Sequence, residues 1–217
     1  MKVWLLNYPS EEDWIGVKRR ALVTVGKLRQ PIKSPDSRWK HKILEARHSP
    51  IRHLWYGFMI EDIPSNIATH LARHIHAQPY ISTLRNDRQE VIDGDLAPRN
   101  TPVNMILDVN AEELMVIANK RLCAKAAKKT REAVEAMCDL AVSVTPELEG
   151  LLVPMCEYQG GVCHEMKPCG RTANEMKKAG YINAEKFIEK YGDKQMSAID
   201  LIDALKSELI QEEWYER

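Results

Sequence analysis

Glycine is scarce in this sequence, with 10 glycines among 217 residues. The chain contains no GxGxxG motif, no Walker loop, no GxSxG motif and no paired-carboxylate signature. The glycine-rich turns of a Rossmann dinucleotide site and of a P-loop need those patterns, so the sequence argues against both folds. A cofactor or nucleotide bound by this chain is therefore expected to meet side chains more than a glycine cradle.

The sequence also lacks an excess of charge of either sign and lacks long apolar runs. Lys and Arg number 31, and so do Asp and Glu, which gives a formal net charge of zero. That balance does not favour nucleic acid as a partner. No apolar run approaches the roughly 18 residues that span a membrane, and no signal peptide is visible. We therefore expect a cytoplasmic protein with no membrane partner.

Charge is unevenly distributed along the chain. Residues 17–52 contain eleven Lys and Arg against Asp36 and Glu45. This pattern is typical of a solvated basic face, and it also fits a surface that attracts anionic small molecules. The five cysteines are an odd number, which in a reducing compartment favours thiols or metal ligands over disulfides.

Residues 73–85, RHIHAQPYISTLR, form the most informative stretch of the sequence. They contain two arginines and two histidines directly after a helical pattern that Ser65 or Asn66 can cap. Guanidinium forks match the geometry of phosphate, and imidazole rings stack on or hydrogen-bond to heterocycles. The stretch therefore favours a ligand that is planar and carries several negative charges.

Periodicity and capping residues predict the order of the elements. A strand over 2–6 precedes a helix that opens with a capping box at Ser10 and runs to about Val25. Another helix is expected over 39–48, a strand over 52–61, and the helix that leads into Arg73. Residues 86–104 are rich in turn formers and predict a functional loop. One long helix is expected from Asn110 to Val144, with shorter helices over 183–190 and 198–214.

This pattern predicts two domains and one pocket at which two cationic side chains lie close together. The break at 146–150 divides a domain over 1–146 from a Cys-rich extension over 147–217. Arg121 lies three turns into the helix that Asn110 caps. If that helix faces the end of the helix at Arg73, two cationic groups converge on one pocket.

Two clusters resemble metal sites. His70 and His74 share a helix face, but Leu71 stands where an HExxH zinc motif has its glutamate, so pocket or surface histidines are favoured. The second cluster lies in the tail, where four residues fall within a fourteen-residue segment: Cys156, Cys163, His164 and Cys169. The cluster fits a structural zinc site, and it also fits free thiols or a redox pair.

At these motifs the sequence resembles the flavin-dependent thymidylate synthase family. That family carries Arg-His-Arg, then a Ser and an Arg further on, and Arg73, His74, Thr83 and Arg85 fall at corresponding positions. Three further segments agree in order: Ala21–Thr24, then the His48-Ser49-Pro50 turn leading to Phe58, and then Asn110, Ala111, Leu114 and Arg121. The resemblance covers about residues 1–140.

The resemblance implies an α+β protomer with a mixed sheet flanked by helices, and here the family fold would carry a small Cys-rich helical tail. It implies a homotetramer that binds FAD and dUMP between subunits. Such an enzyme converts dUMP to dTMP with methylenetetrahydrofolate as one-carbon donor, reduced FAD as reductant and NADPH as the source of electrons. No protein nucleophile attacks the pyrimidine in that family, so cationic side chains orient and polarise the substrate.

Residue roles follow from the resemblance in the same way. Arg73 and Arg121 would be catalytic and would contact the pyrimidine. Ser82, Thr83 and Arg85 would hold the nucleotide, with Arg85 toward its phosphate. The FAD site would be lined by Thr24, Ser49, Arg73, His74, His76 and Asn110.

One departure from the family pattern supports other functions. Ile75 takes the third position of Arg-His-Arg, so one cationic contact is lost. Hydroxymethylation or another C5 modification of a related pyrimidine nucleotide is therefore an alternative. A third possibility is a non-catalytic nucleotide-binding protein or a zinc-stabilised interaction protein.

Overall fold

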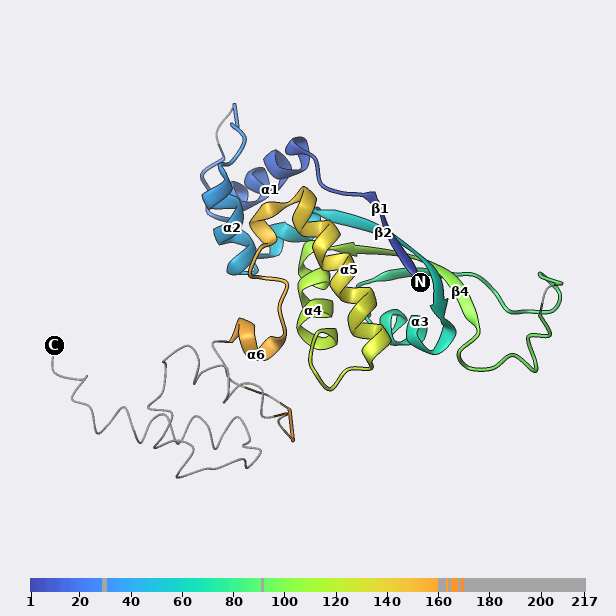
Figure 1. The fold of residues 1–217 in the computed structure, drawn as a ribbon. Coiled ribbons are helices and arrows are strands. Elements are labelled where there is room, and N and C mark those ends of the chain that lie inside the picture. The colour runs from blue at the N-terminus through green and yellow to red at the C-terminus, as the bar shows by residue number, and fades with distance from the viewer. Residues whose placement is uncertain (29–30, 91, 160–162, 164, 168, 170–217) are drawn as a thin grey trace, which may run out of the picture. The chain divides into compact units, whose positions relative to one another are not determined.

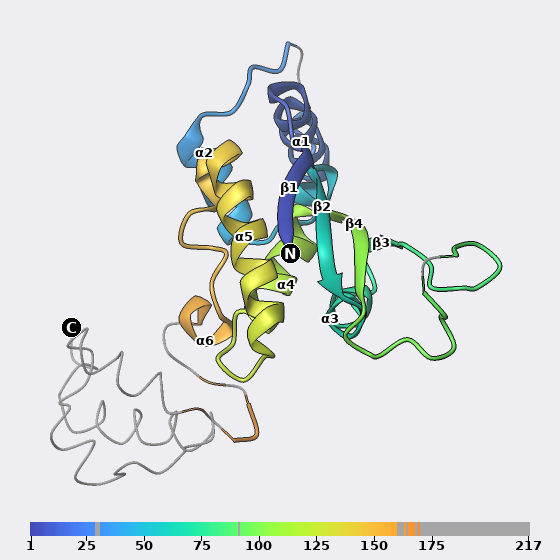
Figure 2. The same ribbon diagram turned by 45° about the vertical axis from the view of Figure 1, so that its right-hand side comes forward.

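A four-stranded sheet lies at the centre of the computed structural model, which describes residues 1–28, 31–90, 92–159, 163, 165–167 and 169. The strand order is β1 (Lys2–Asn7), β2 (Trp55–Pro64), β4 (Pro102–Asn110) and β3 (Gln78–Ile81), and Figure 2 labels all four strands. The α+β class predicted from the sequence is confirmed. All three pairings are antiparallel, so the predicted mixed sheet is wrong. The chain returns from β3 to β4 through a single loop, which places these two strands side by side in opposite directions.

One face of the sheet forms the core. Alternate residues of β2 and β4 face each other on it: Tyr56 opposite Val109, Phe58 opposite Leu107, and Ile60 opposite Met105, all with no exposed surface. Two helices, α4 (Ala111–Arg121) and α5 (Lys128–Val144), cover this face (Figures 1 and 2). The period-2 pattern of the strands therefore meets the apolar stripes of two helices, which is how an α+β domain buries its core.

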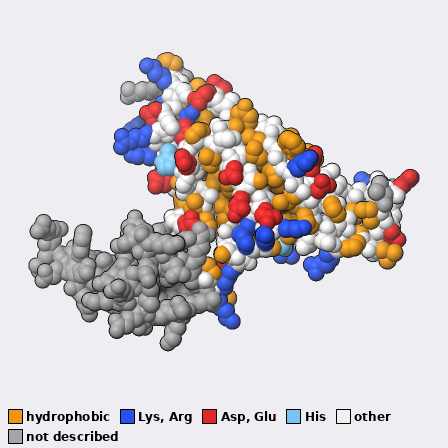
Figure 3. Space-filling model, viewed as in Figure 1, with side chains coloured by type: hydrophobic (Ala, Val, Ile, Leu, Met, Phe, Trp, Pro, Cys, Tyr) orange, Lys and Arg blue, Asp and Glu red, His pale blue; other side chains and the backbone are white. Residues whose placement is uncertain are grey.

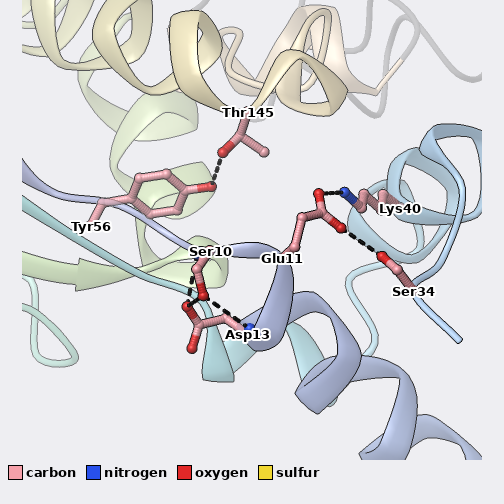
Figure 4. Close-up of polar contacts among 7 residues, drawn as sticks. All are labelled: Ser10, Glu11, Asp13, Ser34, Lys40, Tyr56 and Thr145. Atoms are coloured by element: carbon pink, nitrogen blue, oxygen red, sulfur yellow. Dashed lines mark hydrogen bonds and ion pairs between the residues drawn. The ribbon is translucent and has the colours of Figure 1, made fainter. Parts of the chain in front are cut away.

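The first two helices are joined by polar contacts at their N-terminal ends. In α1 (Glu11–Thr24), the Ser10 hydroxyl accepts from the Asp13 N–H at 3.3 Å, and the Asp13 carboxylate accepts from the Ser10 N–H at 2.8 Å. This confirms the predicted capping box, which Figure 4 shows. Glu11 pairs with Lys40 of α2 (Ser37–Glu45) and accepts from the Ser34 hydroxyl at 2.6 Å. The hydrogen bond from Lys40 lowers the pKa of Glu11.

A buried hydrogen bond joins the sheet to the end of α5. The Tyr56 hydroxyl donates to the Thr145 hydroxyl at 3.0 Å, as Figure 4 shows. Burial raises the pKa of Tyr56, and the bond satisfies a polar group that would otherwise be stranded in the core. Figure 3 views the α5 side of the molecule and shows Lys and Arg side chains gathered near α2.

Several element boundaries differ from the predictions. The helix expected from Asn110 to Val144 is two helices, because the chain leaves α4 after Arg121 and enters α5 only at Lys128. The strand expected from residue 52 begins at Trp55, because Ser49–His53 forms a 3₁₀ turn, η1. The third helix, α3 (Ser65–Ala72), ends before Arg73. Strands β3 and β4 were not expected.

Two compact units are present. Residues 1–122 with 126–152 form the first, which ends with the short 3₁₀ turn η2 (Pro146–Leu148). Residues 123–125 and 153 onward form the second, where the structure describes α6 (Met155–Tyr158). The predicted boundary at 146 stays a prediction, and the helices predicted over 183–190 and 198–214 lie outside the described residues. Within the described part of the chain, no helix is both long enough and apolar enough to cross a bilayer.

Candidate functional site

The site is built around the C-terminal end of α3. Ile67 and Leu71 bury the apolar side of this helix, and Arg73 is its C-cap residue. The chain turns there, which sends Arg73 outward and His74 inward: the His74 side chain is 7% exposed, whereas Ile75 is 86% exposed. Two adjacent residues of the predicted motif thus have different environments, one at the surface and one in the interior.

Helix α4 brings Arg121 to the same place. Asn110 caps this helix by accepting from the Glu113 N–H at 2.9 Å. At its last turn, Arg121 Nε donates to His74 Nε2 at 3.0 Å, and Arg121 Nη2 donates to the His70 carbonyl at 2.7 Å. The helix that Asn110 caps therefore faces the end of α3, and Arg121 and Arg73 come from distant segments to one region of positive charge.

The charges in this region repel one another. Burial lowers the pKa of Arg121, and the nearby Arg73 lowers it further. The pKa of His70 is lowered by burial first and then by Arg121 and Arg73. Burial opposes a charge of either sign, but the contributions from the two arginines show a positive potential in this region, which favours an anion.

Two pockets flank this group. The first, here the α3 pocket, has a volume of about 180 Å³ and is lined by Ser65, Asn66, Thr69, His70, Arg73 and Arg99. The second, here the η1–α4 pocket, has a volume of about 310 Å³ and is lined by Arg52, His76, Asn110, Glu112, Glu113 and Val116. His74 lies between the two pockets: it donates to Glu113, which lines the η1–α4 pocket, and it directly follows Arg73, which lines the α3 pocket.

A larger pocket lies among α1, α2 and η1, here called the α1–α2 pocket. Its volume is about 600 Å³, and it includes two residues predicted to contact FAD, Thr24 and Ser49. A Cβ on Gly16 would lie 2.7 Å from His53 Nε2, so a larger residue at this point of α1 would displace the His53 ring. The remaining lining is mainly apolar: Ala21, Val25, Trp39, Lys42, Ile43, Ala46, His48 and Pro50.

The loop after β3 is not part of these pockets. Ser82 accepts from the Asn104 N–H at 2.9 Å, and the Thr83 hydroxyl accepts from the Arg85 N–H at 3.1 Å. Arg85 makes a two-pronged ion pair with Asp87, at 2.9 and 2.7 Å. Ser82, Thr83 and Arg85 are predicted to hold the nucleotide, but none of them lines any of the three pockets. Figures 1 and 2 show this loop projecting away from α4 and α5.

Glu113 is one site residue that sequence reasoning missed. Its position three residues after Asn110 is typical of the acidic first turn of a capped helix, and it fills that role. Its carboxylate also accepts from His74 Nδ1 at 3.0 Å, 39 residues away in sequence. No local pattern carries that second contact.

The metal hypotheses have different outcomes. His70 Nδ1 lies 2.9 Å from the Thr130 hydroxyl, and both nitrogens of His74 have protein partners. Across the part of the chain that the structure describes, no three metal-ligating side chains gather. His164 lies outside that part, so zinc at Cys156, Cys163, His164 and Cys169 stays a prediction.

Comparisons with known proteins give a likeness of fold. No family model matches the sequence, and no curated protein matches it. A solved structure of thymidylate synthase X from Helicobacter pylori with FAD and dUMP has a TM-score of 0.57 at 18% identity, covering 70% of this chain and 99% of that chain. A second, the flavin-dependent thymidylate synthase of the same organism complexed with FAD and dUMP, has a TM-score of 0.52 at 18% identity, covering 64% and 93%. The chain therefore shares the fold of these enzymes.

Proposed function

We propose that this protein is a flavin-dependent thymidylate synthase. It would convert dUMP to dTMP, with methylenetetrahydrofolate as one-carbon donor, reduced FAD as reductant and NADPH as the source of electrons. The observation that carries the proposal is the approach of Arg121 to the end of α3 beside Arg73, in a fold shared with enzymes solved with FAD and dUMP. A dianionic nucleotide is the kind of ligand that two adjacent guanidinium groups stabilise.

The pockets suit FAD. The α1–α2 pocket combines apolar walls with the hydroxyls of Thr24 and Ser49, and its volume lies in the range of small-molecule sites. His76 and Asn110 line the η1–α4 pocket, and His74 borders it through Glu113. These residues and Arg73 would hold the cofactor, which supplies hydride-transfer chemistry when bound. The chain itself would orient the two ligands and exclude water from between them.

Arg73 and Arg121 would contact the pyrimidine and polarise it. Because two hydrogen bonds to the protein hold Arg121, it would need little reorganisation to act on the substrate. Ser82, Thr83 and Arg85 would complete the nucleotide site from the loop after β3. In the proposed cytoplasmic homotetramer, with ligands bound between subunits, that projecting loop would reach the site of a neighbouring copy.

Ile75 supports a second candidate function. It presents an apolar surface, 86% exposed, beside Arg73, at the position where the family motif has a further cation. A site with one cation fewer fits a different C5 modification of a pyrimidine nucleotide, such as hydroxymethylation. A non-catalytic nucleotide-binding protein, or one stabilised by zinc in its tail, is the remaining alternative.

Two measurements separate these functions. The visible absorption spectrum of the purified protein, before and after incubation with FAD, tests flavin binding. A protein that carries no flavin and takes none up contradicts both enzymatic functions. The product formed from dUMP or dCMP with methylenetetrahydrofolate and NADPH is then identified by mass. A methyl group on dUMP supports the first proposal, and a hydroxymethyl group on either nucleotide supports the second.

A further inference from the structure

A chain of three buried or half-buried side chains joins α4 to the end of α3. Glu113 Oε1 lies 3.0 Å from His74 Nδ1, and His74 Nε2 lies 3.0 Å from Arg121 Nε. The Glu113 and His74 side chains are 5% and 7% exposed. Glu113 is on the first turn of α4 and Arg121 on its last, so the imidazole ring bridges two ends of one helix.

The chemistry of arginine fixes the proton on the imidazole. The Nε of a guanidinium always carries hydrogen and never accepts, so His74 Nε2 must be the acceptor and must lack a proton. The ring proton is then on Nδ1 and is donated to the Glu113 carboxylate. A ring protonated on both nitrogens would place an N–H against the Arg121 Nε–H. The contacts thus require one neutral tautomer of His74.

The chain also leaves Arg121 able to bind an anion. Its two hydrogen bonds use Nε and Nη2 and not Nη1. Among the described residues no carboxylate lies within ion-pair distance of Arg121, although Glu113 is only one ring away. A carboxylate bonded directly to the guanidinium would compete with an anionic ligand. With imidazole between them, Glu113 sets the direction of Arg121 and leaves most of its charge uncompensated.

We propose that Glu113 is a positioning residue for nucleotide binding: it fixes His74 as the Nδ1–H tautomer, and His74 in turn holds the Arg121 guanidinium toward the nucleotide. This inference rests on the proposed function for the identity of the ligand, dUMP. The tautomer itself does not depend on the ligand, so it can be tested even if the protein binds no nucleotide.

The experiment compares Glu113→Leu, which removes the acceptor, with Glu113→Gln, which keeps one. The control is Glu132→Leu, which replaces a carboxylate on α5 that pairs with Lys128. Imidazole ¹⁵N shifts of histidine-labelled full-length protein report the tautomer, with His74→Asn used for assignment. Calorimetric titrations give the dissociation constants for FAD and, with FAD bound, for dUMP.

Wild-type His74 is expected to show a protonated Nδ1 and an unprotonated Nε2 at neutral pH. Glu113→Leu is expected to lose this signature and to weaken dUMP binding by about 10-fold to 100-fold, while Glu113→Gln keeps the signature and stays within about threefold. Because Glu113 lines the η1–α4 pocket proposed for FAD, FAD affinity is measured in the same variants and dUMP affinity is compared with FAD bound. A merely structural role would not link dUMP affinity to the tautomer in this way or produce this rescue by glutamine.

Three outcomes would overturn the proposal. The first is a wild-type ring protonated at Nε2. The second is a folded variant in which His74 loses its Nδ1 proton while dUMP binding is unchanged. Either Glu113 variant can give this result, so Glu113→Gln still tests the proposal if Glu113→Leu fails to fold. The third is an equal loss of dUMP affinity in Glu132→Leu. A wild-type protein that has the expected tautomer but binds neither FAD nor dUMP overturns the proposed function and removes the binding role with it, and the tautomer assignment stands.

Discussion

Arg121 and Arg85 are held in opposite ways. Arg121 is half-buried, and its guanidinium bonds to His74 and to the His70 carbonyl, which lie 47 and 51 residues earlier in the chain. Arg85 is 64% exposed and pairs with Asp87, only two residues further along the chain. One guanidinium is fixed by the tertiary structure of the protein. The other is held by the local sequence of its loop.

This difference separates two parts of the proposed site. The end of α3 and the end of α4 are joined by hydrogen bonds from Arg121 to His74 and to the His70 carbonyl, which suits groups that polarise a substrate. The loop after β3 keeps its own polar groups satisfied, and an exposed ion pair such as Arg85–Asp87 is weak enough to exchange for a phosphate. The loop would therefore contribute to binding only when a ligand replaces Asp87.

The largest effect is expected for Arg73→Ala. Removing a guanidinium that stabilises developing charge should lower kcat/KM for dUMP by about 100-fold to 1,000-fold. The fold should be unaffected because Arg73 is exposed. Steady-state kinetics measure the first effect, and thermal unfolding monitored by circular dichroism measures the second.

Arg88→Ala is the matched control for that variant. It removes another exposed arginine, one in the loop whose nearest carboxylate is Asp87 at 4.0 Å. Its kcat/KM should stay near the wild-type value. Ordinary activity in Arg73→Ala would end the role assigned to the rigid half of the site.

A smaller effect is expected in the loop. Arg85→Ala should weaken dUMP binding by about tenfold, because one charge-assisted hydrogen bond to phosphate is lost. Asp87→Asn should tighten binding by a few-fold, since it removes the carboxylate that competes for Arg85. Calorimetric titration of the FAD-loaded protein with dUMP gives both values. If neither variant differs from wild type, the loop has no part in nucleotide binding.

Sequence reasoning succeeded where the signal is local. The capping box at Ser10 and the cap at Asn110 were predicted correctly because each depends on residues three apart. It failed at β3 and β4, since Pro79 and the turn-rich residues before Pro102 are typical of loops. Those strands form because apolar residues of β4, such as Leu107, pair with β2 in the core, and pairing over that distance has no local signature.

The site shows the same limit. The motif around Arg73 and the position of Arg121 were visible in the sequence, and so was the conditional prediction that they converge. The turn that buries His74 while exposing Arg73 was not, nor was the contact between His74 and Glu113. These depend on where α4 lies against α3. The break after Arg121, where one continuous helix is predicted from the sequence, allows α5 to turn back over the same sheet face.

The smallest expected effect is a pH dependence at His70, on the rigid side of the comparison. Burial, Arg121 and Arg73 lower the pKa of this ring, and its Nδ1 faces the Thr130 hydroxyl of α5. The unliganded ring is therefore neutral between its lowered pKa and the ordinary value of about 6.5. A bound dianion would offset the two guanidinium charges and raise the pKa of His70. Binding of dUMP should then take up a proton in that window and tighten as pH falls through it, by at most about tenfold if the ligand makes the ring ten times more basic.

Calorimetry in two buffers of different ionisation enthalpy measures the proton uptake. His70→Asn corrects for protonation of the nucleotide phosphate itself, and equal uptake in wild type and His70→Asn would place the bound anion away from the α3 pocket.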